Sequence, residues 1–148
     1  GPLCFFSYWG ALLRILLSEF SVSRRAEAFQ DGSVLSVVFG PNIIGCFVMG
    51  IIQHPKSKPW MLKVIGSDIH TGISTGFAGS LTSFSSWIGY SVALLFLFYP
   101  SVPPVIEVIW CLFVGWATSY LSFYGGYHAV QAWDTIFPFA DEQEAKPI

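Results

Sequence analysis

The sequence predicts an all-α integral membrane protein with four transmembrane helices, the third of which is broken at mid-membrane. Of its 148 residues, 53% are hydrophobic and 11% are charged, whereas soluble domains carry about 25% charged residues. Four apolar stretches, at about 3–20, 34–53, 69–98 and 105–131, are separated by segments that hold nearly all the charge and most of the proline. Because a transmembrane helix takes roughly 20 apolar residues, each stretch matches one span.

Composition excludes several classes of function. Seven basic and nine acidic residues give a formal net charge of −2, so the chain lacks the basic surface that nucleic-acid binding requires. The cysteines lie in apolar stretches, which favours packing over a disulfide or a metal site. Phosphate-binding loops, nucleophile elbows and HExxH motifs do not occur in the sequence, so we expect no enzyme activity.

The four stretches form one predicted transmembrane domain, residues 1–131. The motif HPKSKP at 54–59 predicts a turn, because two prolines within five residues do not continue a helix. Residues 132–148 form a polar acidic tail or the start of a linker. The chain opens with Gly1-Pro2 and no methionine, which indicates either a trimmed chain or an excerpt of a longer protein.

The segment from Thr71 to Trp87 combines glycine and hydroxyl side chains inside an apolar stretch. Glycine permits unusual backbone angles and hydroxyls satisfy freed backbone groups, so this composition predicts a helix interrupted near Gly79 to Thr82. Breaks at membrane depth occur where they are buried or line a cavity, and their carbonyl groups suit a cation. The alternative is that the small residues form a packing face.

Three side chains near this segment suit a pore for anions. Asn42 begins the run NIIGCFVMG; its amide N–H groups either point into a pore or staple two helices together. Phe84 and Trp87, spaced i and i+3, share one helix face. The positive edges of their rings stabilise an anion without adding a full charge, and the alternative is simple packing.

Arg14 lies within an apolar stretch, where an arginine costs about 2.5–3.5 kcal/mol on insertion scales. It either snorkels to an interface or faces a watery vestibule and attracts anions. The acidic residues near the spans lie at their predicted ends. A proton-coupled cation transporter, which needs a carboxylate at mid-membrane, is therefore disfavoured.

Together these residues resemble the Fluc and fluoride exporter family of small fluoride channels. Three segments match in order. YWGALLRILLS resembles the first helix of the family, GPNIIGCFVMG the second, and TGFAGSLTSFSSW the break in the third helix, usually written GGLTTFSTF. The resemblance covers roughly residues 8–131.

The resemblance implies a role for each matching position. Gly79 and Thr82 match the two residues whose backbone carbonyls hold a structural sodium ion together with the opposing half. Asn42 matches the pore asparagine, Phe84 the first phenylalanine of the fluoride-coordinating aromatic box, and Arg14 the arginine beside the aqueous entrance. Trp87 stands where the family has its second box phenylalanine.

In the family the fourth helix carries a polar track of hydroxyls one turn apart. Two alignments of this chain remain open. One places Cys111, Gly115 and Ser119 on the track, and the other uses Thr118, Ser122 and Gly126.

By resemblance, the chain is half of an inverted channel and pairs in antiparallel orientation with a second homologous four-helix unit. Bacterial members are homodimers, whereas eukaryotic exporters join two such domains, and the Trp87 substitution favours the eukaryotic type. The implied function is passive fluoride efflux across the plasma membrane, which relieves fluoride toxicity. The alternatives are a small drug-resistance-type transporter with four helices and dual topology, and a non-conducting scaffold subunit.

Overall fold

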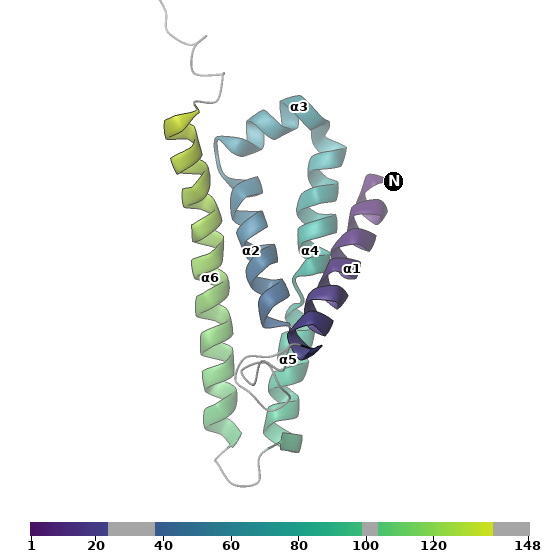
Figure 1. Cartoon of the computed structure of the whole chain (residues 1–148), viewed down its shortest axis with the longest axis vertical. Coiled ribbons are helices and arrows are strands. Elements are labelled where there is room, and N and C mark those ends of the chain that lie inside the picture. Colours follow the sequence, from purple (N-terminus) through teal and green to yellow (C-terminus); the bar gives the residue numbers. More distant parts are fainter. Residues whose placement is uncertain (24–37, 99–103, 138–148) are drawn as a thin grey trace, which may run out of the picture.

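The computed structural model describes residues 1–23, 38–98 and 104–137, and every regular element among them is a helix (Figure 1). In chain order these elements are α1 (Pro2–Ser23), α2 (Phe39–Gln53), α3 (Ser57–Thr71), the π-helix η2 (Gly72–Ala78), α4 (Gly79–Leu81), α5 (Phe84–Ala93), the π-helix η3 (Leu94–Phe98) and α6 (Pro104–Ile136). The pieces between 57 and 98 follow one another as a bent and broken rod. The described residues therefore form four helical rods.

Two of these rods are long and apolar enough to cross a membrane alone, over Pro2–Phe20 and Val105–Ile136. The second of them, α6, continues past residue 131, the predicted end of the fourth span, to Ile136. No proline or glycine interrupts the chain there, and Asp134 forms an ion pair with Lys56 that holds this last turn against the bundle. Residues 34–37 of the second predicted span and 138–148 of the tail lie outside the described residues.

The third rod begins earlier than predicted, because α3 starts at Ser57 and the turn occupies only residues 54–56. Pro59 is compatible with this helix, since it lies in the first turn, where backbone N–H groups have no helical acceptor. At Gly66 the backbone adopts φ 78° and ψ 164°, a region that favours glycine. The chain bends there, and the segment 57–65 crosses from the end of α2 before the rod descends beside it (Figure 1).

The predicted break in the third rod is confirmed, and it lies at Thr82 and Ser83. Thr82 has φ −77° and ψ 144°, and Ser83 has φ −140° and ψ 93°, both extended. Gly79 is itself helical, with φ −66° and ψ −35°. The interruption therefore falls at the end of the predicted interval, where an external partner for the Ser83 backbone replaces the helical one.

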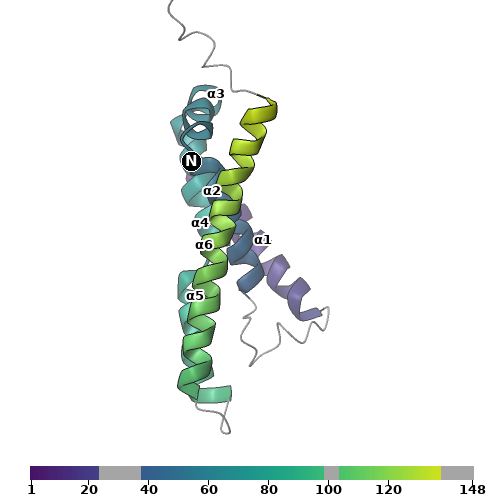
Figure 2. The same cartoon turned by 90° about the vertical axis from the view of Figure 1, so that its left-hand side faces the viewer.

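Glycines on α1 and on the segment before the break allow the two to pack closely. A Cβ atom on Gly10 would collide with the carbonyl oxygen of Phe77, and one on Gly76 would lie 2.8 Å from the carbonyl oxygen of Leu3. Small residues allow such close backbone contact between membrane helices. The alternative that small residues of this segment form a packing face is therefore confirmed for Gly76. The packing face and the break are both present. Figure 2 shows how α1 crosses the other rods at an angle.

A second backbone contact joins α2 and α6. A Cβ atom on Gly50 would collide with the carbonyl oxygen of Phe123, and a Cβ atom on Gly126 would collide with that of Phe47. The two contacts are reciprocal, since each helix supplies one glycine and one carbonyl. The glycines therefore bring the two helices closer than side chains would allow.

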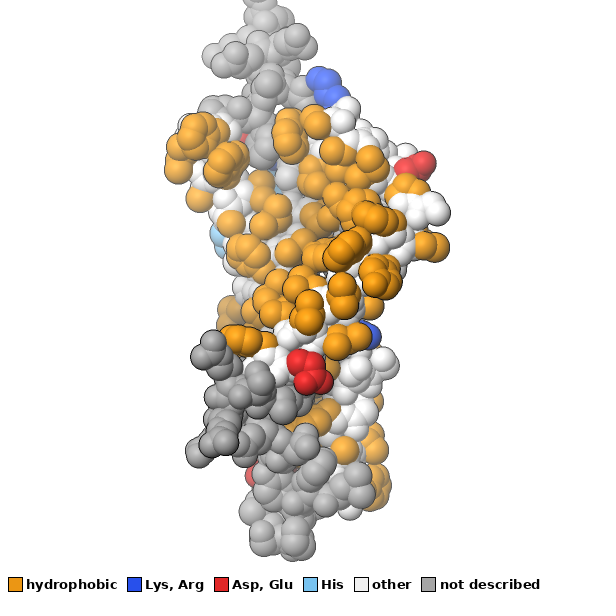
Figure 3. All heavy atoms as spheres, turned by 45° about the vertical axis from the view of Figure 1, so that its right-hand side comes forward, with side chains coloured by type: hydrophobic (Ala, Val, Ile, Leu, Met, Phe, Trp, Pro, Cys, Tyr) orange, Lys and Arg blue, Asp and Glu red, His pale blue; other side chains and the backbone are white. Residues whose placement is uncertain are grey.

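The outside of the bundle is apolar. Figure 3 shows hydrophobic side chains gathered over the face on the side of α1. Large exposed side chains on this helix include Phe5, Tyr8, Trp9, Ile15, Leu16 and Phe20. Such a surface suits lipid rather than water.

The contact between α2 and α6 predicts that Gly126→Ala destabilises the protein, by about 1–3 kcal/mol if the cost is that of ordinary overpacking. Gly125→Ala is the matched control, because its Cβ atom would lie 3.7 Å from the Phe47 ring, an ordinary contact. Melting temperatures of the purified proteins in detergent should fall for Gly126→Ala alone. Equal melting temperatures for the two variants would contradict the close approach.

Candidate functional site

The break in the third rod is joined to α2 by one hydrogen bond. The backbone N–H of Ser83 donates to Oδ1 of Asn42 at 2.7 Å. In an unbroken helix this N–H would donate to the carbonyl of Gly79. The side chain of Asn42 therefore replaces a backbone acceptor, and the interhelical staple considered for it is present.

The residues before Ser83 close the first half of the rod. The Thr82 backbone N–H donates to the Ala78 carbonyl at 3.0 Å, and its hydroxyl donates to the same oxygen at 3.1 Å and to the Gly79 carbonyl at 3.4 Å. Gly79 is exposed, and a Cβ atom there would have nothing within 4 Å among the described residues. The carbonyl of Gly79 has thus lost its backbone donor. The surface of the rod at Gly79 is not covered by any other described residue.

Ser83 also starts the second half of the rod. Its hydroxyl accepts a hydrogen bond from the Ser86 backbone N–H at 3.2 Å and donates to the Ser86 hydroxyl at 2.6 Å. Serine is a favoured N-cap because it satisfies a free N–H group of the first turn. The N-cap role of Ser83 was not predicted, although a serine directly before the run beginning with Phe84 is an N-cap signal.

The aromatic pair lies directly after the cap. The Phe84 and Trp87 ring centroids are 5.7 Å apart and the rings meet edge to face at 75°. Trp87 packs on α6, where a Cβ atom on Gly115 would lie 2.6 Å from its indole Nε1. Phe84 is 70% exposed. Trp87 therefore anchors the pair, and Phe84 presents its ring outside the packed bundle.

The two candidate tracks on α6 lie along one side of the helix, facing α2 and α5. The Cys111 sulfur lies 3.7 Å from the Ser91 hydroxyl of α5, and the Ser119 hydroxyl is in hydrogen-bond contact with the Cys46 thiol of α2. Ser122 donates to the Ile43 carbonyl of α2 at 2.6 Å. Both alignments thus describe parts of the same packed stripe.

Thr118 belongs to this part of α6 but bonds within its own helix. Its hydroxyl donates to the Val114 carbonyl at 2.6 Å and to the Gly115 carbonyl at 3.2 Å. The hydroxyl protons of Thr118 and Ser122 are therefore directed at backbone oxygens.

Arg14 is half-buried on α1. It lies one turn past Gly10 and on the same face, and Gly10 contacts Phe77 in η2. The face of α1 that carries Arg14 is therefore turned toward the third rod. Within the described residues, no carboxylate lies within 4.0 Å of this side chain, and the ion pair found joins Lys56 and Asp134.

The arrangement favours an anion over a cation at the aromatic pair. The Oδ1 atom of Asn42 is occupied by Ser83, and no described residue accepts a hydrogen bond from its Nδ2 atom. The free end of the amide therefore carries two N–H donors beside the residue that precedes Phe84. Amide N–H groups and aromatic edges are electropositive.

Comparison with known proteins shows which family the chain is similar to. The family model described as CrcB-like protein, Camphor Resistance (CrcB), matches residues 2–127. A protein of Geotalea daltonii named fluoride-specific ion channel FluC is 30% identical over 114 residues, 75% of this chain and 86% of its own length. Proteins of the same name from Helicobacter acinonychis and Helicobacter pylori strain G27 are 43% and 45% identical over 80 residues.

These two Helicobacter matches cover 53% of this chain and 56% and 55% of the relatives, so the chain spans about half the length of several curated relatives it matches. The relatives reported are bacterial, and they do not support the expectation of the eukaryotic type. No solved structure matches the chain.

The Ser83 bond predicts that Asn42→Leu destabilises the protein, by about 1–3 kcal/mol, because it leaves a buried N–H without an acceptor. Asn42→Asp is the control, since a carboxylate oxygen still accepts from Ser83. Thermal unfolding in detergent should show a lower melting temperature for the leucine variant than for the aspartate variant. The opposite order would mean that the Ser83 bond contributes little to the fold.

Proposed function

We propose that this chain, which belongs to the CrcB family, forms half of a fluoride-selective channel and passes fluoride passively out of the cell. As a member of this family, the chain is a membrane protein. Relatives that align with 53% to 75% of the chain carry the name fluoride-specific ion channel. The expected benefit is relief of fluoride toxicity.

The observation that carries this proposal is the fixed direction of the Asn42 amide. Fluoride is small and strongly hydrated, so a pore must replace its water shell with hydrogen-bond donors. The Ser83 N–H at 2.7 Å holds Oδ1, and a flipped amide would place an N–H group against another N–H. The Nδ2 donors are therefore kept available for the anion.

The aromatic pair would supply the second kind of contact. Because Trp87 packs on α6, we assign the direct contact with fluoride to the exposed Phe84 ring, with Trp87 orienting it edge-on. On α6, Ser119 suits the track better than Thr118 or Ser122, because its hydroxyl contacts the weakly accepting Cys46 thiol, whereas the other two donate to backbone carbonyls. Arg14, on the face of α1 turned toward the third rod, would attract the anion at the vestibule.

A second four-helix unit in antiparallel orientation would complete the pore. Gly79 and Thr82 offer carbonyl oxygens beside the break, and Gly79 faces open space. Hard cations prefer several oxygen ligands, so two carbonyls from one chain suit a sodium ion only when a second unit contributes two more. We propose that such an ion supplies a structural cross-link at the contact. The partner is either a second copy or a homologous domain of the same protein.

Fluoride efflux from liposomes distinguishes this function from the two alternatives. If the protein is a channel, fluoride should leave the liposomes passively, without a proton gradient. We propose that this channel lies in the plasma membrane. A drug-resistance-type transporter predicts proton-coupled movement of an organic cation, and a scaffold predicts no flux. The chain should be reconstituted alone and with any second domain of its natural protein.

Replacement of Asn42 with aspartate tests the amide directly. The carboxylate keeps the Ser83 bond but replaces both N–H donors with acceptor atoms and a negative charge. Fluoride efflux, measured with a fluoride electrode, should fall at least tenfold while the protein remains folded. The measurement requires an assembly in which this half lines the only active pore. Undiminished efflux there would remove Asn42 from the mechanism.

The open face at Gly79 predicts that Gly79→Val prevents assembly. The branched side chain would occupy the surface that a second unit must approach, while the isolated chain has room for it. Cross-linking in liposomes should detect fewer pairs, with the melting temperature of the single chain retained. Wild-type levels of cross-linked pairs would place the contact elsewhere.

A further inference from the structure

The first half of α3, residues 57–65, is a surface helix rather than part of a span. Lys56 precedes it, and it contains Lys58 and Lys63 together with Trp60. It ends at Gly66, whose positive φ turns the chain into the descending rod. Figure 1 shows this segment running across the end of the bundle.

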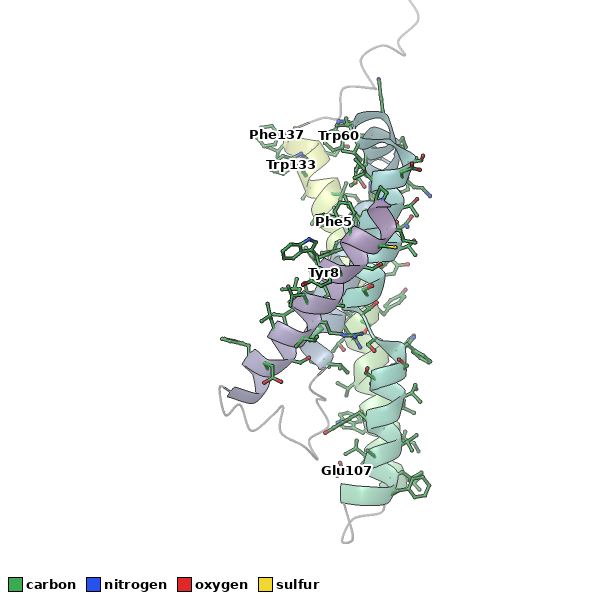
Figure 4. All side chains as sticks on the ribbon, turned by 90° about the vertical axis from the view of Figure 1, so that its right-hand side faces the viewer. Phe5, Tyr8, Trp60, Glu107, Trp133 and Phe137 are labelled. Atoms are coloured by element: carbon green, nitrogen blue, oxygen red, sulfur yellow. The ribbon has the colours of Figure 1, made fainter. Side chains whose placement is uncertain are left out.

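An ion pair fixes the level of this segment relative to α6. Lys56 Nζ lies 2.7 Å from Asp134 Oδ2, next to the exposed Trp133. Figure 4 shows Trp60, Trp133 and Phe137 at the same end of the molecule, with Glu107 at the other. The surface helix and the end of α6 therefore share one level.

That level corresponds to a membrane interface. Trp133 is 23 residues from Trp110, the exposed tryptophan near the other end of α6. At 1.5 Å per residue they are about 34 Å apart, close to the roughly 30 Å thickness of the hydrocarbon layer. Tryptophans collect at the two faces of a bilayer. Residues 57–65 consequently lie at the headgroup layer.

The faces of the helix agree with this position. Ser57 is buried and Met61 and Ile65 are half-buried, so this row faces the protein. The adjacent row, Trp60 and Val64, is 41% and 60% exposed. The protein therefore leaves this apolar flank uncovered, and Lys58, Leu62 and Lys63 are exposed on the remainder of the helix.

We propose that residues 57–65 form an interfacial helix that binds anionic lipid headgroups. Trp60 and Val64 insert below the headgroups, and Lys58 and Lys63 contact lipid phosphates. Lysines that flank an inserted apolar row reach the headgroups with their charged ends while their stems cover apolar surface, and each nearby lysine adds electrostatic attraction to anionic lipid. The occupant of the uncovered flank is thus lipid, not a second copy of the chain.

Nitroxide labels at two positions test the orientation. Val64→Cys and Lys58→Cys should be labelled in the full chain after Cys4→Ser, because Cys4 is the exposed cysteine among the three. In vesicles of phosphatidylcholine and phosphatidylglycerol, the label at 64 should meet oxygen more readily than a water-soluble nickel chelate. The label at 58 should show the reverse preference. Exposure of position 64 to nickel, or protection from both reagents, would overturn the proposal.

The lipid preference has a separate test. Adding phosphatidylglycerol should raise the melting temperature of the protein more than adding phosphatidylcholine does. The double variant Lys58→Gln, Lys63→Gln should lose most of that difference, whereas Lys58→Arg, Lys63→Arg should retain it. An unchanged difference in the glutamine variant would show that these lysines do not bind the headgroups.

Discussion

The satisfaction of backbone hydrogen bonds in lipid is the constraint on which the rest of this structure depends. An interrupted helix exposes N–H and carbonyl groups that cost several kcal/mol each when unpaired in hydrocarbon. Here the interruption at Thr82 and Ser83 is tolerated because neighbouring polar groups replace the lost partners. Asn42 accepts from Ser83, the Ser83 hydroxyl accepts from Ser86, and the Thr82 hydroxyl donates to the Gly79 carbonyl. The same replacement determines the direction in which the Asn42 amide points.

Close backbone contacts then position the groups beside the interruption. Gly10 and Gly76 hold the first rod against the third, and Gly50 and Gly126 hold α2 against α6. With α6 in place, Gly115 leaves room for Trp87, and the Trp87 ring meets the exposed Phe84 ring edge to face. Small residues distributed over all four rods therefore position the Trp87 ring that Phe84 contacts.

Sequence patterns predicted the helical class, the interruption and the shared face of Phe84 and Trp87, because each depends on local composition or helical spacing. The early start of α3 was missed, since Pro59 reads as a helix breaker and is in fact tolerated in a first turn. The partner of Asn42 could not be predicted. Periodicity identifies the face on which a side chain lies, but the partner is a backbone N–H whose freedom depends on where the third rod stops.

The reciprocal contact between Gly50 and Gly126 has a mechanical consequence. At this contact the main chains of the two helices touch, so no side-chain layer can yield there, and the bond from Ser122 to the Ile43 carbonyl adds a second link. We therefore expect α2 and α6 to move as one rigid body. The width of any passage along this pair of helices would then change only through rotation of single side chains or displacement of α5. Such changes are fast and small in amplitude.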